Sequence, residues 1–148
     1  MKKFHGLKYL PHVALALLLL LTIFITVCFP VQQIEGNSME PTIKENSLVI
    51  ICRFYYRLLW KKPSLNDIII FRDSSGSRLI KRICGLPGDK INYRDNRLKE
   101  YREIPDGYYL VLGDNYESSR DSRHIGLIST TQIEGKVIFW SSNEKAKK

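Results

Sequence analysis

The stretch DIIIFRDSSGSRLIKRIC, residues 67–84, decides the class of fold. Residues 67–71 and 78–84 are short, mainly apolar runs typical of β-strands, and the polar segment 73–77 between them is typical of a turn. Further runs of this kind lie at residues 47–52, 90–93, 97–100, 108–112 and 133–140. Short strands punctuated by Gly, Pro, Asn and Asp predict an all-β domain of antiparallel sheet.

One membrane-length apolar run precedes these segments. Residues 13–29 carry no charge and lie between Pro11 and Pro30. As a helix they would span about 26 Å, which just crosses a hydrocarbon core of ~30 Å. A cleaved secretory signal needs small residues before its cleavage point, but this run ends in TVCFP, which offers no such site. A lipoprotein signal is also disfavoured, because Val27 is bulkier than the residue that normally precedes a lipidated cysteine. The pattern favours an uncleaved signal-anchor, that is, a single transmembrane helix.

The charges around the run indicate its orientation. Lys2, Lys3 and Lys8 precede it with no acidic residue beside them, so the positive-inside rule places the N-terminus in the cytoplasm. We expect three parts in a monomeric, single-pass chain. These are a short cytoplasmic N-terminus at residues 1–11, a signal-anchor in the cell membrane at 12–30 and an extracytoplasmic domain at 31–148.

The domain after the anchor is basic. The net charge is +8, and without the three N-terminal lysines 20 Lys and Arg face 15 Asp and Glu, which leaves +5. The charges are scattered among strand-like segments without helix-turn-helix or zinc spacing, so we expect no nucleic-acid partner. Attraction to a lipid bilayer explains the excess. Residues 54–62, rich in aromatic and basic side chains, fit either the bilayer interface or a core strand followed by a charged loop.

The three cysteines do not form a disulfide framework. Cys28 lies in the anchor, while Cys52 and Cys84 lie in apolar strand patterns, where a thiol most often acts as a small buried hydrophobe. A bridge between Cys52 and Cys84 outside the cell is the less favoured alternative. No Cys/His cluster has metal-ligand spacing, and we expect neither a metal nor a cofactor.

Ser38 is the strongest candidate for a nucleophile. It lies in EGNSMEPT, residues 35–42, where Gly36 allows close backbone approach and Pro41 stops a strand from continuing. A serine hydroxyl needs a base. His5 and His12 would lie at or across the membrane, so His124 and a lysine are the remaining candidates for this base.

Lys81 is that lysine, and it sits in a more ordered setting than His124. In a strand it would share one face with Leu79 and Ile83. To act as a base near neutral pH, a lysine must lose roughly 3 pKa units, which requires burial. For Lys81 alone, a solvated strand lysine is the simpler interpretation.

The loop GDNYESSRDSR, residues 113–123, favours the catalytic interpretation. Its hydroxyls could orient a buried amine, and its carboxylates and guanidinium groups could lock the loop by a bidentate pair. An ordinary exposed loop could have the same composition, so the loop gains weight only together with Ser38 and Lys81.

Three segments, in this order and spacing behind an anchor, closely resemble bacterial type I signal peptidases. They are Ser38-Met39-x-Pro41-Thr42, Lys81-Arg82-Ile83 with Gly85-x-Pro87-Gly88-Asp89, and Gly113-Asp114-Asn115 with Ser119-x-Asp121-Ser122-Arg123. The resemblance implies a membrane-bound serine endopeptidase that needs no cofactor. Its substrates would be the signal peptides of exported preproteins, cut after small residues at positions −1 and −3.

The resemblance also implies roles for individual residues. Ser38 would be the nucleophile, Lys81 the general base and Ser119 the group that orients the lysine. The remaining supporting residues would be Asp114, Asp121 and Arg123, with Arg82 as a salt-bridge partner. Gly36 stands where some members carry a hydroxyl that helps to bind the oxyanion, as in Gram-positive-type members, so backbone amides would do more of this work.

One departure and several alternatives accompany the resemblance. Only 23 residues separate Asp89 from Gly113, where larger members insert a second β domain, so we expect a reduced second β subdomain at residues 90–107. Self-cleaving repressors share Ser–Lys chemistry but would carry a DNA-binding head in place of the anchor. A dedicated peptidase or assembly factor for a pilin or conjugation system, or a non-enzymatic anchored binding paralogue, also stays open.

Overall fold

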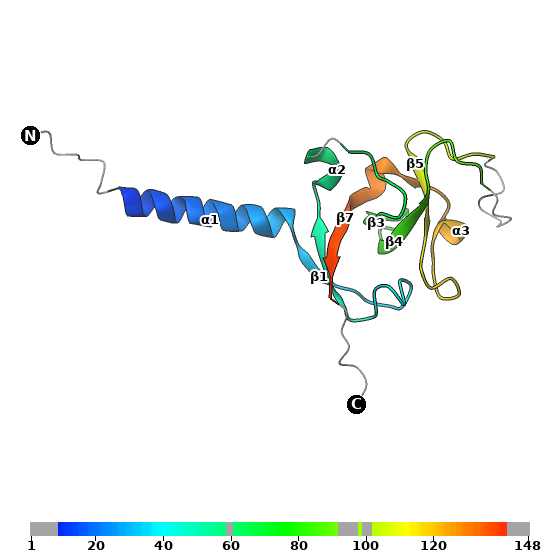
Figure 1. Ribbon diagram of the computed structural model, residues 1–148, viewed down its shortest axis with the longest axis horizontal. Helices are drawn as coiled ribbons and strands as arrows, with labels where there is room; N and C mark the ends of the chain where they lie inside the picture. The colour runs from blue at the N-terminus through cyan, green and yellow to red at the C-terminus, as the bar shows by residue number, and fades with distance from the viewer. Residues whose placement is uncertain (1–8, 59–60, 92–97, 99–101, 142–148) are drawn as a thin grey trace, which may run out of the picture.

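A long helix leads into a small β domain in the computed structural model (Figure 1). The structure describes residues 9–58, 61–91, 98 and 102–141. The helices are α1 Leu10–Cys28, α2 Tyr55–Leu58 and α3 Ser122–Ile125, with a 3-10 turn at Thr130–Gln132. The strands are β1 Val31–Gln33, β2 Leu48–Cys52, β3 Ile68–Arg72, β4 Arg78–Gly85, β5 Tyr108–Leu112, β6 Ile128–Ser129 and β7 Ile133–Trp140.

The strands form one seven-stranded sheet in the order β1-β2-β7-β3-β4-β5-β6, and every pair in it is antiparallel. The hairpin predicted from residues 67–84 lies at its centre, with Ile69 opposite Lys81 and Arg72 opposite Arg78. Its turn forms because the Asp73 carboxylate accepts from two backbone amides of the turn at 2.9 Å. The predicted all-β class is therefore confirmed.

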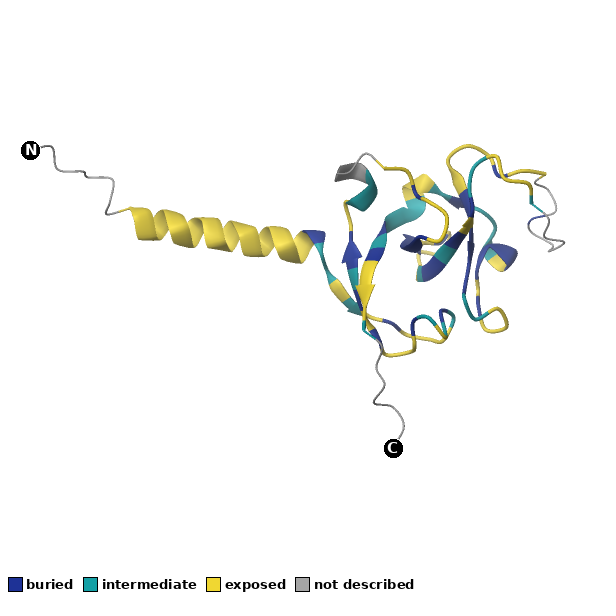
Figure 2. Cartoon of the chain, in the orientation of Figure 1, coloured by how far each residue is buried: buried dark blue, intermediate teal, exposed yellow. Residues whose placement is uncertain are grey.

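Central strands bury both of their faces, which explains why β3 is apolar throughout. Ile68 and Ile70 belong to one hydrophobic cluster, and Ile69 and Phe71 belong to another. Figure 2 shows the resulting buried interior of the domain against the exposed surface of α1. Burying a side chain of this size stabilises the fold by roughly 1.5–3 kcal/mol. The core thus fixes β4, which carries Lys81.

The helix α1 has no protein partner along its length. Every residue from Leu10 to Val27 is exposed, and only Cys28 is buried. Pro11 lies in its first turn, where a missing N–H costs nothing. The helix is long and apolar enough to cross a membrane. Its first residue lies two positions before the expected start of the anchor at residue 12. Its last residue lies two positions before the expected end at residue 30.

The aromatic segment after β2 is not a core strand. Residues Tyr55–Leu58 form a helical turn, and tertiary contacts hold it. The Tyr56 hydroxyl donates to the Asp67 carboxylate at 2.9 Å, and the Lys136 ammonium binds the same carboxylate at 2.6 Å and lies 4.4 Å from the centre of the Tyr55 ring. Residues 59–60 lie outside the described part of the chain.

Much of the expected subdomain at 90–107 also lies outside the described residues, including most of the predicted strands 90–93 and 97–100. Lys90 forms one isolated bridge with Glu103. Leu98, Ile104 and Leu110 make a small hydrophobic cluster beside β5.

The three cysteines are free. Cys52 and Cys84 lie on β2 and β4, which β7 and β3 separate in the sheet. Cys84 is exposed, so the expectation of a buried thiol is wrong at this position. Its side of β4 is shared with the half-exposed Arg82, where the sheet is open to solvent.

Candidate active site

The central contact of the site joins Lys81 and Ser38. The Lys81 Nζ donates to the Ser38 Oγ at 2.7 Å and to the carbonyl oxygen of Ile80 at 2.8 Å. Lys81 is only 2% exposed, whereas Ser38 is half-buried. The structure thus joins two residues that lie 43 positions apart, and the interpretation of Lys81 as a solvated lysine is wrong.

Ser38 lies on the loop between β1 and β2, and this loop is held at its base and beside Ser38. At the base, the Ile34 amide donates to the Ser47 carbonyl at 2.9 Å. Met39, next to Ser38, is 1% exposed and belongs to the main core cluster. Gly36 has a φ of 83°, a left-handed conformation that favours glycine. The hydroxyl is therefore held in one place against β4.

The environment of Lys81 favours its neutral form. Burial lowers its pKa from 10.5 to about 8, although the negative charges of Asp121 and Asp114 oppose this change. At pH 7, roughly a tenth of an amine with such a pKa is neutral. A neutral amine in contact with a hydroxyl can accept its proton.

Arg82 ties the strand of Lys81 to the loop after β5. Its Nε and Nη2 donate to the two carboxylate oxygens of Asp114 at 2.8 and 2.6 Å. Burial would raise the pKa of Asp114, but its bonds with Arg82 and Thr42 hold it below the usual value. Asp114 is thus the partner of Arg82, and this bidentate pair fixes the loop beside the Ser38–Lys81 contact.

Asp121 anchors the same loop through bonds to Gly113 and Arg123. It is fully buried and accepts from the Arg123 Nε and Nη2 at 2.8 Å each and from the Gly113 amide at 2.9 Å. Burial alone would raise its pKa, but these donors lower it below the usual value. Arg123 also lies 3.7 Å from the centre of the Tyr116 ring. The carboxylate therefore holds Gly113 in place.

Ser119 is buried close to the Ser38–Lys81 contact without bonding to Lys81. Its hydroxyl makes no hydrogen bond of ordinary geometry within the described residues, although it lies near enough to Asp121 to help lower that carboxyl's pKa. The orienting contact seen for Lys81 comes instead from the Ile80 carbonyl.

Two amides near Ser38 differ in their partners. The Gly36 amide donates to the Glu45 carboxylate at 3.2 Å, a contact that the sequence pattern did not indicate. The Ser38 amide makes no hydrogen bond within the described residues. Asn115 is part of the loop pattern but has no assigned role there. Its backbone N–H donates to the Ser38 carbonyl at 3.0 Å. Of the Gly36 and Ser38 amides, only that of Ser38 is thus without a partner among the described residues.

His124, the rival base, lies on α3 away from this contact. Its side chain is 58% exposed, and its Nδ1 lies 3.9 Å from Asp121. It makes no hydrogen bond with Ser38. The geometry therefore pairs Ser38 with Lys81.

The comparison with known families agrees with this geometry. A family model described as "Signal peptidase, peptidase S26" matches residues 7–100 and 96–141. The chain belongs to this family.

Individual relatives carry the same name. Signal peptidase IB of Staphylococcus aureus (strain Mu50 / ATCC 700699) is 29% identical over 177 aligned positions, which cover 93% of this chain and 91% of the relative. Signal peptidase I of Bacillus caldolyticus is 32% identical, over 72% of this chain and 75% of the relative. A crystal structure of a signal peptidase I from Enterococcus faecalis V583 is 30% identical, with a TM-score of 0.44, over 51% of this chain and 97% of that chain. The family match and the two sequence relatives confirm the expected signal-peptide-cleaving serine peptidase.

In this signal peptidase family member, a cleft of about 200 Å³ opens beside the Ser38–Lys81 contact. Its walls come from β1 and the segment after it, and from β3 and β4. The lining residues are Gln32, Gln33, Ile34, Glu35, Ser38, Ile70, Arg78, Leu79, Ile80 and Lys81. β1 pairs with β2 on one side only, so its other edge can accept an extended peptide.

Gly113→Ala is expected to lower the cleavage rate by about a hundredfold, the cost of misplacing a catalytic group by about 1 Å. The new Cβ would lie 2.5 Å from the Ser38 carbonyl oxygen and would also collide with the Ser119 Oγ. The Ser38 backbone would have to shift, which would disturb the contact of its hydroxyl with Lys81. Initial cleavage rates test this, with Gly85→Ala as the control for a steric clash elsewhere, because its Cβ would lie 2.6 Å from the Ile104 side chain and would not meet the Ser38 loop. Equal rates for Gly113→Ala and the wild type would contradict the close approach.

Proposed function

We propose that Ser38 is the nucleophile and Lys81 the general base of a membrane-anchored signal peptidase I that cleaves exported preproteins after small residues at positions −1 and −3. The 2.7 Å contact between the buried Lys81 amine and the Ser38 hydroxyl carries this proposal.

The reaction proceeds in two steps. Neutral Lys81 takes the Ser38 proton as the Oγ attacks the scissile carbonyl, and the free Ser38 N–H stabilises the oxyanion. Lys81 then gives the proton to the leaving amine, which leaves an acyl-enzyme on Ser38. In the second step Lys81 deprotonates a water molecule that attacks this ester, and the proton returns to the Ser38 oxygen. We assign Gly36 to shaping the loop, because its own amide is bonded to Glu45.

The supporting residues hold this arrangement in place. Arg82 with Asp114, and Asp121 with Arg123, position the loop that carries Asn115 against the Ser38 carbonyl. Ser119 fills the space beside Gly113. All of them act through Ser38 or Lys81.

Activity should depend on the protonation of Lys81. Because only the neutral amine can accept the Ser38 proton, kcat/KM is expected to rise about tenfold per pH unit below the pKa and to level off above about 8. Initial rates between pH 6 and 10 on one preprotein test this. A rate that stays constant from pH 6 to 9 would exclude Lys81 as the base.

For localisation, we propose that residues 1–11 are cytoplasmic, 12–30 span the cell membrane and 31–148 lie outside as a monomeric domain on the bilayer. The exposed helix α1 is compatible with a span. Near its end, exposed apolar side chains from β1, β2 and β7 would face the lipid. These are Val31, Leu48 and Phe139.

Cys84 offers a test of this orientation. It is exposed, whereas Cys28 and Cys52 are buried, so a membrane-impermeant maleimide should label intact cells at Cys84 alone. Labelling at about pH 8.5 is advisable because partial desolvation of the thiol raises the pKa of Cys84, although the residue is exposed. Cys84→Ser serves as the control. Labelling that requires cell lysis would place the domain on the cytoplasmic side.

The activity itself is tested with a model preprotein that carries an Ala-x-Ala site. The wild-type chain in detergent is expected to cut directly after that site, as N-terminal sequencing of the product would show. The absence of a product from folded protein would favour a dedicated substrate or a binding role.

A further inference from the structure

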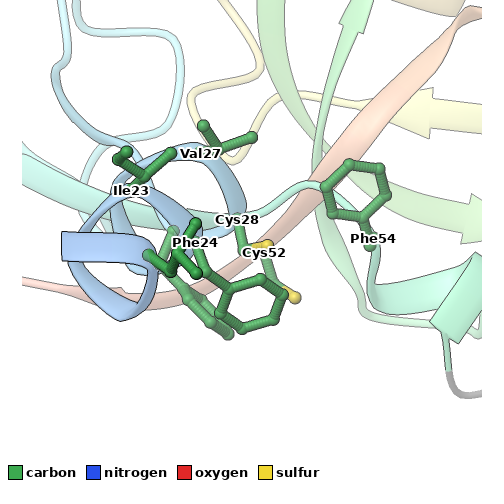
Figure 3. A pocket seen from close by; sticks show the side chains of 8 residues that line it. Ile23, Phe24, Val27, Cys28, Cys52 and Phe54 are labelled. Atoms are coloured by element: carbon green, nitrogen blue, oxygen red, sulfur yellow. The ribbon is translucent and has the colours of Figure 1, made fainter. Parts of the chain in front are cut away.

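A large pocket lies away from Ser38, where α1 meets the sheet. It measures about 580 Å³. Figure 3 shows Phe24 and Val27 of α1, and Phe54 after β2, around the same space. All lining side chains are apolar or cysteine, namely Leu20, Ile23, Phe24, Val27, Cys28, Phe29, Cys52 and Phe54. The mechanism above leaves this pocket without a role.

Neighbouring pockets lead from this anchor pocket to the catalytic cleft. A second pocket, of about 440 Å³, shares Phe54 with the anchor pocket and is otherwise mainly polar. Arg53, Arg72 and Arg78 line this middle pocket, and Glu134 accepts from Arg72 and Arg78. Arg78 in turn lines the cleft beside Ser38 and Lys81. Shared lining residues thus place an apolar pocket, a polar pocket and the catalytic cleft side by side, and we call this succession the track.

The direction and length of the track fit a chain that emerges from the bilayer. Arg78 precedes Lys81 by three residues on β4, or about 10 Å along a strand. The protein's own chain covers the distance from the end of α1 at Cys28 to Ser38 in ten residues, at most about 36 Å when extended. A second chain that leaves the bilayer beside α1 can reach the cleft with an extended segment of similar length.

We propose that the anchor pocket holds the apolar segment of a bound signal peptide against α1, while its polar segment passes Arg53 and Arg78 to the cleft. This inference rests on the proposed function. It assigns a binding site to the part of the substrate that lies before the cleavage site. A lipid acyl chain fits the apolar end but gives no account of the passage to Ser38. The succession of three neighbouring pockets that ends at Ser38 therefore favours the substrate as the occupant.

Blocking the pocket should weaken the binding of complete preproteins only. Val27→Trp places a large ring in the pocket. Ile25→Trp places the ring on another face of α1, because residues two positions apart in a helix point about 200° apart around its axis. For a preprotein with its apolar segment, Val27→Trp is expected to raise KM by about tenfold or more, the lower cost of a misfit in an apolar pocket, with kcat unchanged. Ile25→Trp should behave as the wild type. A short peptide that spans only the cleavage site should be cut equally by all three proteins.

Equal KM values for Val27→Trp and Ile25→Trp on the complete preprotein would overturn the proposal. So would an equal loss on the short peptide, because it would indicate a disturbed cleft rather than a blocked pocket. If the wild type cuts neither substrate, the proposed function itself fails. These outcomes keep the two failures distinguishable.

Photo-crosslinking identifies the occupant directly. The full chain with Ser38→Ala, which keeps the substrate uncut, is placed in phosphatidylethanolamine–phosphatidylglycerol vesicles with p-benzoylphenylalanine in place of Phe24 or, as the control, of Ile25. Position 24 is expected to crosslink to the apolar segment of the preprotein, and position 25 is not. Lipid adducts alone at position 24, unchanged by added preprotein, would overturn the proposal in favour of a lipid site.

Discussion

Cleavage is expected to fall by at least about a thousandfold in both Ser38→Ala and Lys81→Met. The first variant removes the attacking oxygen, and the second removes the amine that lies 2.7 Å from it. The double variant should be no worse than either single variant, because the two residues act as one unit. Rates on an Ala-x-Ala preprotein, measured beside the wild type, test this. Activity retained in Lys81→Met would transfer the base role to another group, with His124 the first to examine.

The stability of Lys81→Met separates a catalytic loss from a folding defect. Lys81 has a pKa of about 8 in the fold and 10.5 when exposed, so the unfolded chain binds more protons between these values. Wild-type stability should therefore rise with pH across this window. This difference between the two pKa values means that the buried ammonium lowers the free energy of unfolding by about 3 kcal/mol at pH 7.

Methionine removes that cost, so Lys81→Met should unfold at a higher temperature than the wild type at pH 7. The gap should narrow toward pH 10.5. Thermal unfolding in detergent at both pH values measures this gap. A variant less stable than the wild type at pH 7 would indicate that the bonds from Lys81 to Ser38 and Ile80 outweigh its desolvation.

The strands were predictable where the sequence carries a long apolar run. β2, β3, β4, β5 and β7 all coincide with predicted segments to within one or two residues. The short elements β1, β6 and α3 have too few residues to show a period. The helix α2 depends on contacts with Asp67 and Lys136, which are distant in sequence. Local pattern alone could not have revealed it.

The site shows a similar division. Residue types and spacing brought out Ser38, Lys81 and the loop 113–123. The burial of Lys81 arises because β3 and β5 flank β4 and the Ser38 loop packs beside it, which no local pattern encodes. The bond between Glu45 and Gly36 depends in the same way on how one loop closes on itself.

Asp121→Asn is expected to destabilise the fold by about 3–5 kcal/mol, the usual result of breaking a buried ion pair from one side. Arg123 would keep its charge while only 7% exposed, and the Gly113 amide would lose a charged acceptor. Because the pKa of Asp121 lies below its usual value, the wild-type advantage should be complete above the ordinary carboxyl range. It should disappear as the pH falls through the pKa in the fold.

The matched control for Asp121→Asn is Asp67→Asn. Asp67 is also buried and ion-paired, but its carboxylate binds Tyr56 and Lys136 rather than the loop beside Ser38. Both variants should unfold at lower temperature than the wild type. At a temperature where both remain folded, only Asp121→Asn should also cut slowly, because Asp67→Asn leaves Gly113 and the Ser38 carbonyl in place. Normal cleavage by folded Asp121→Asn would mean that Asp121 serves stability alone, and that the pair of Arg82 and Asp114 suffices to hold the loop against Ser38.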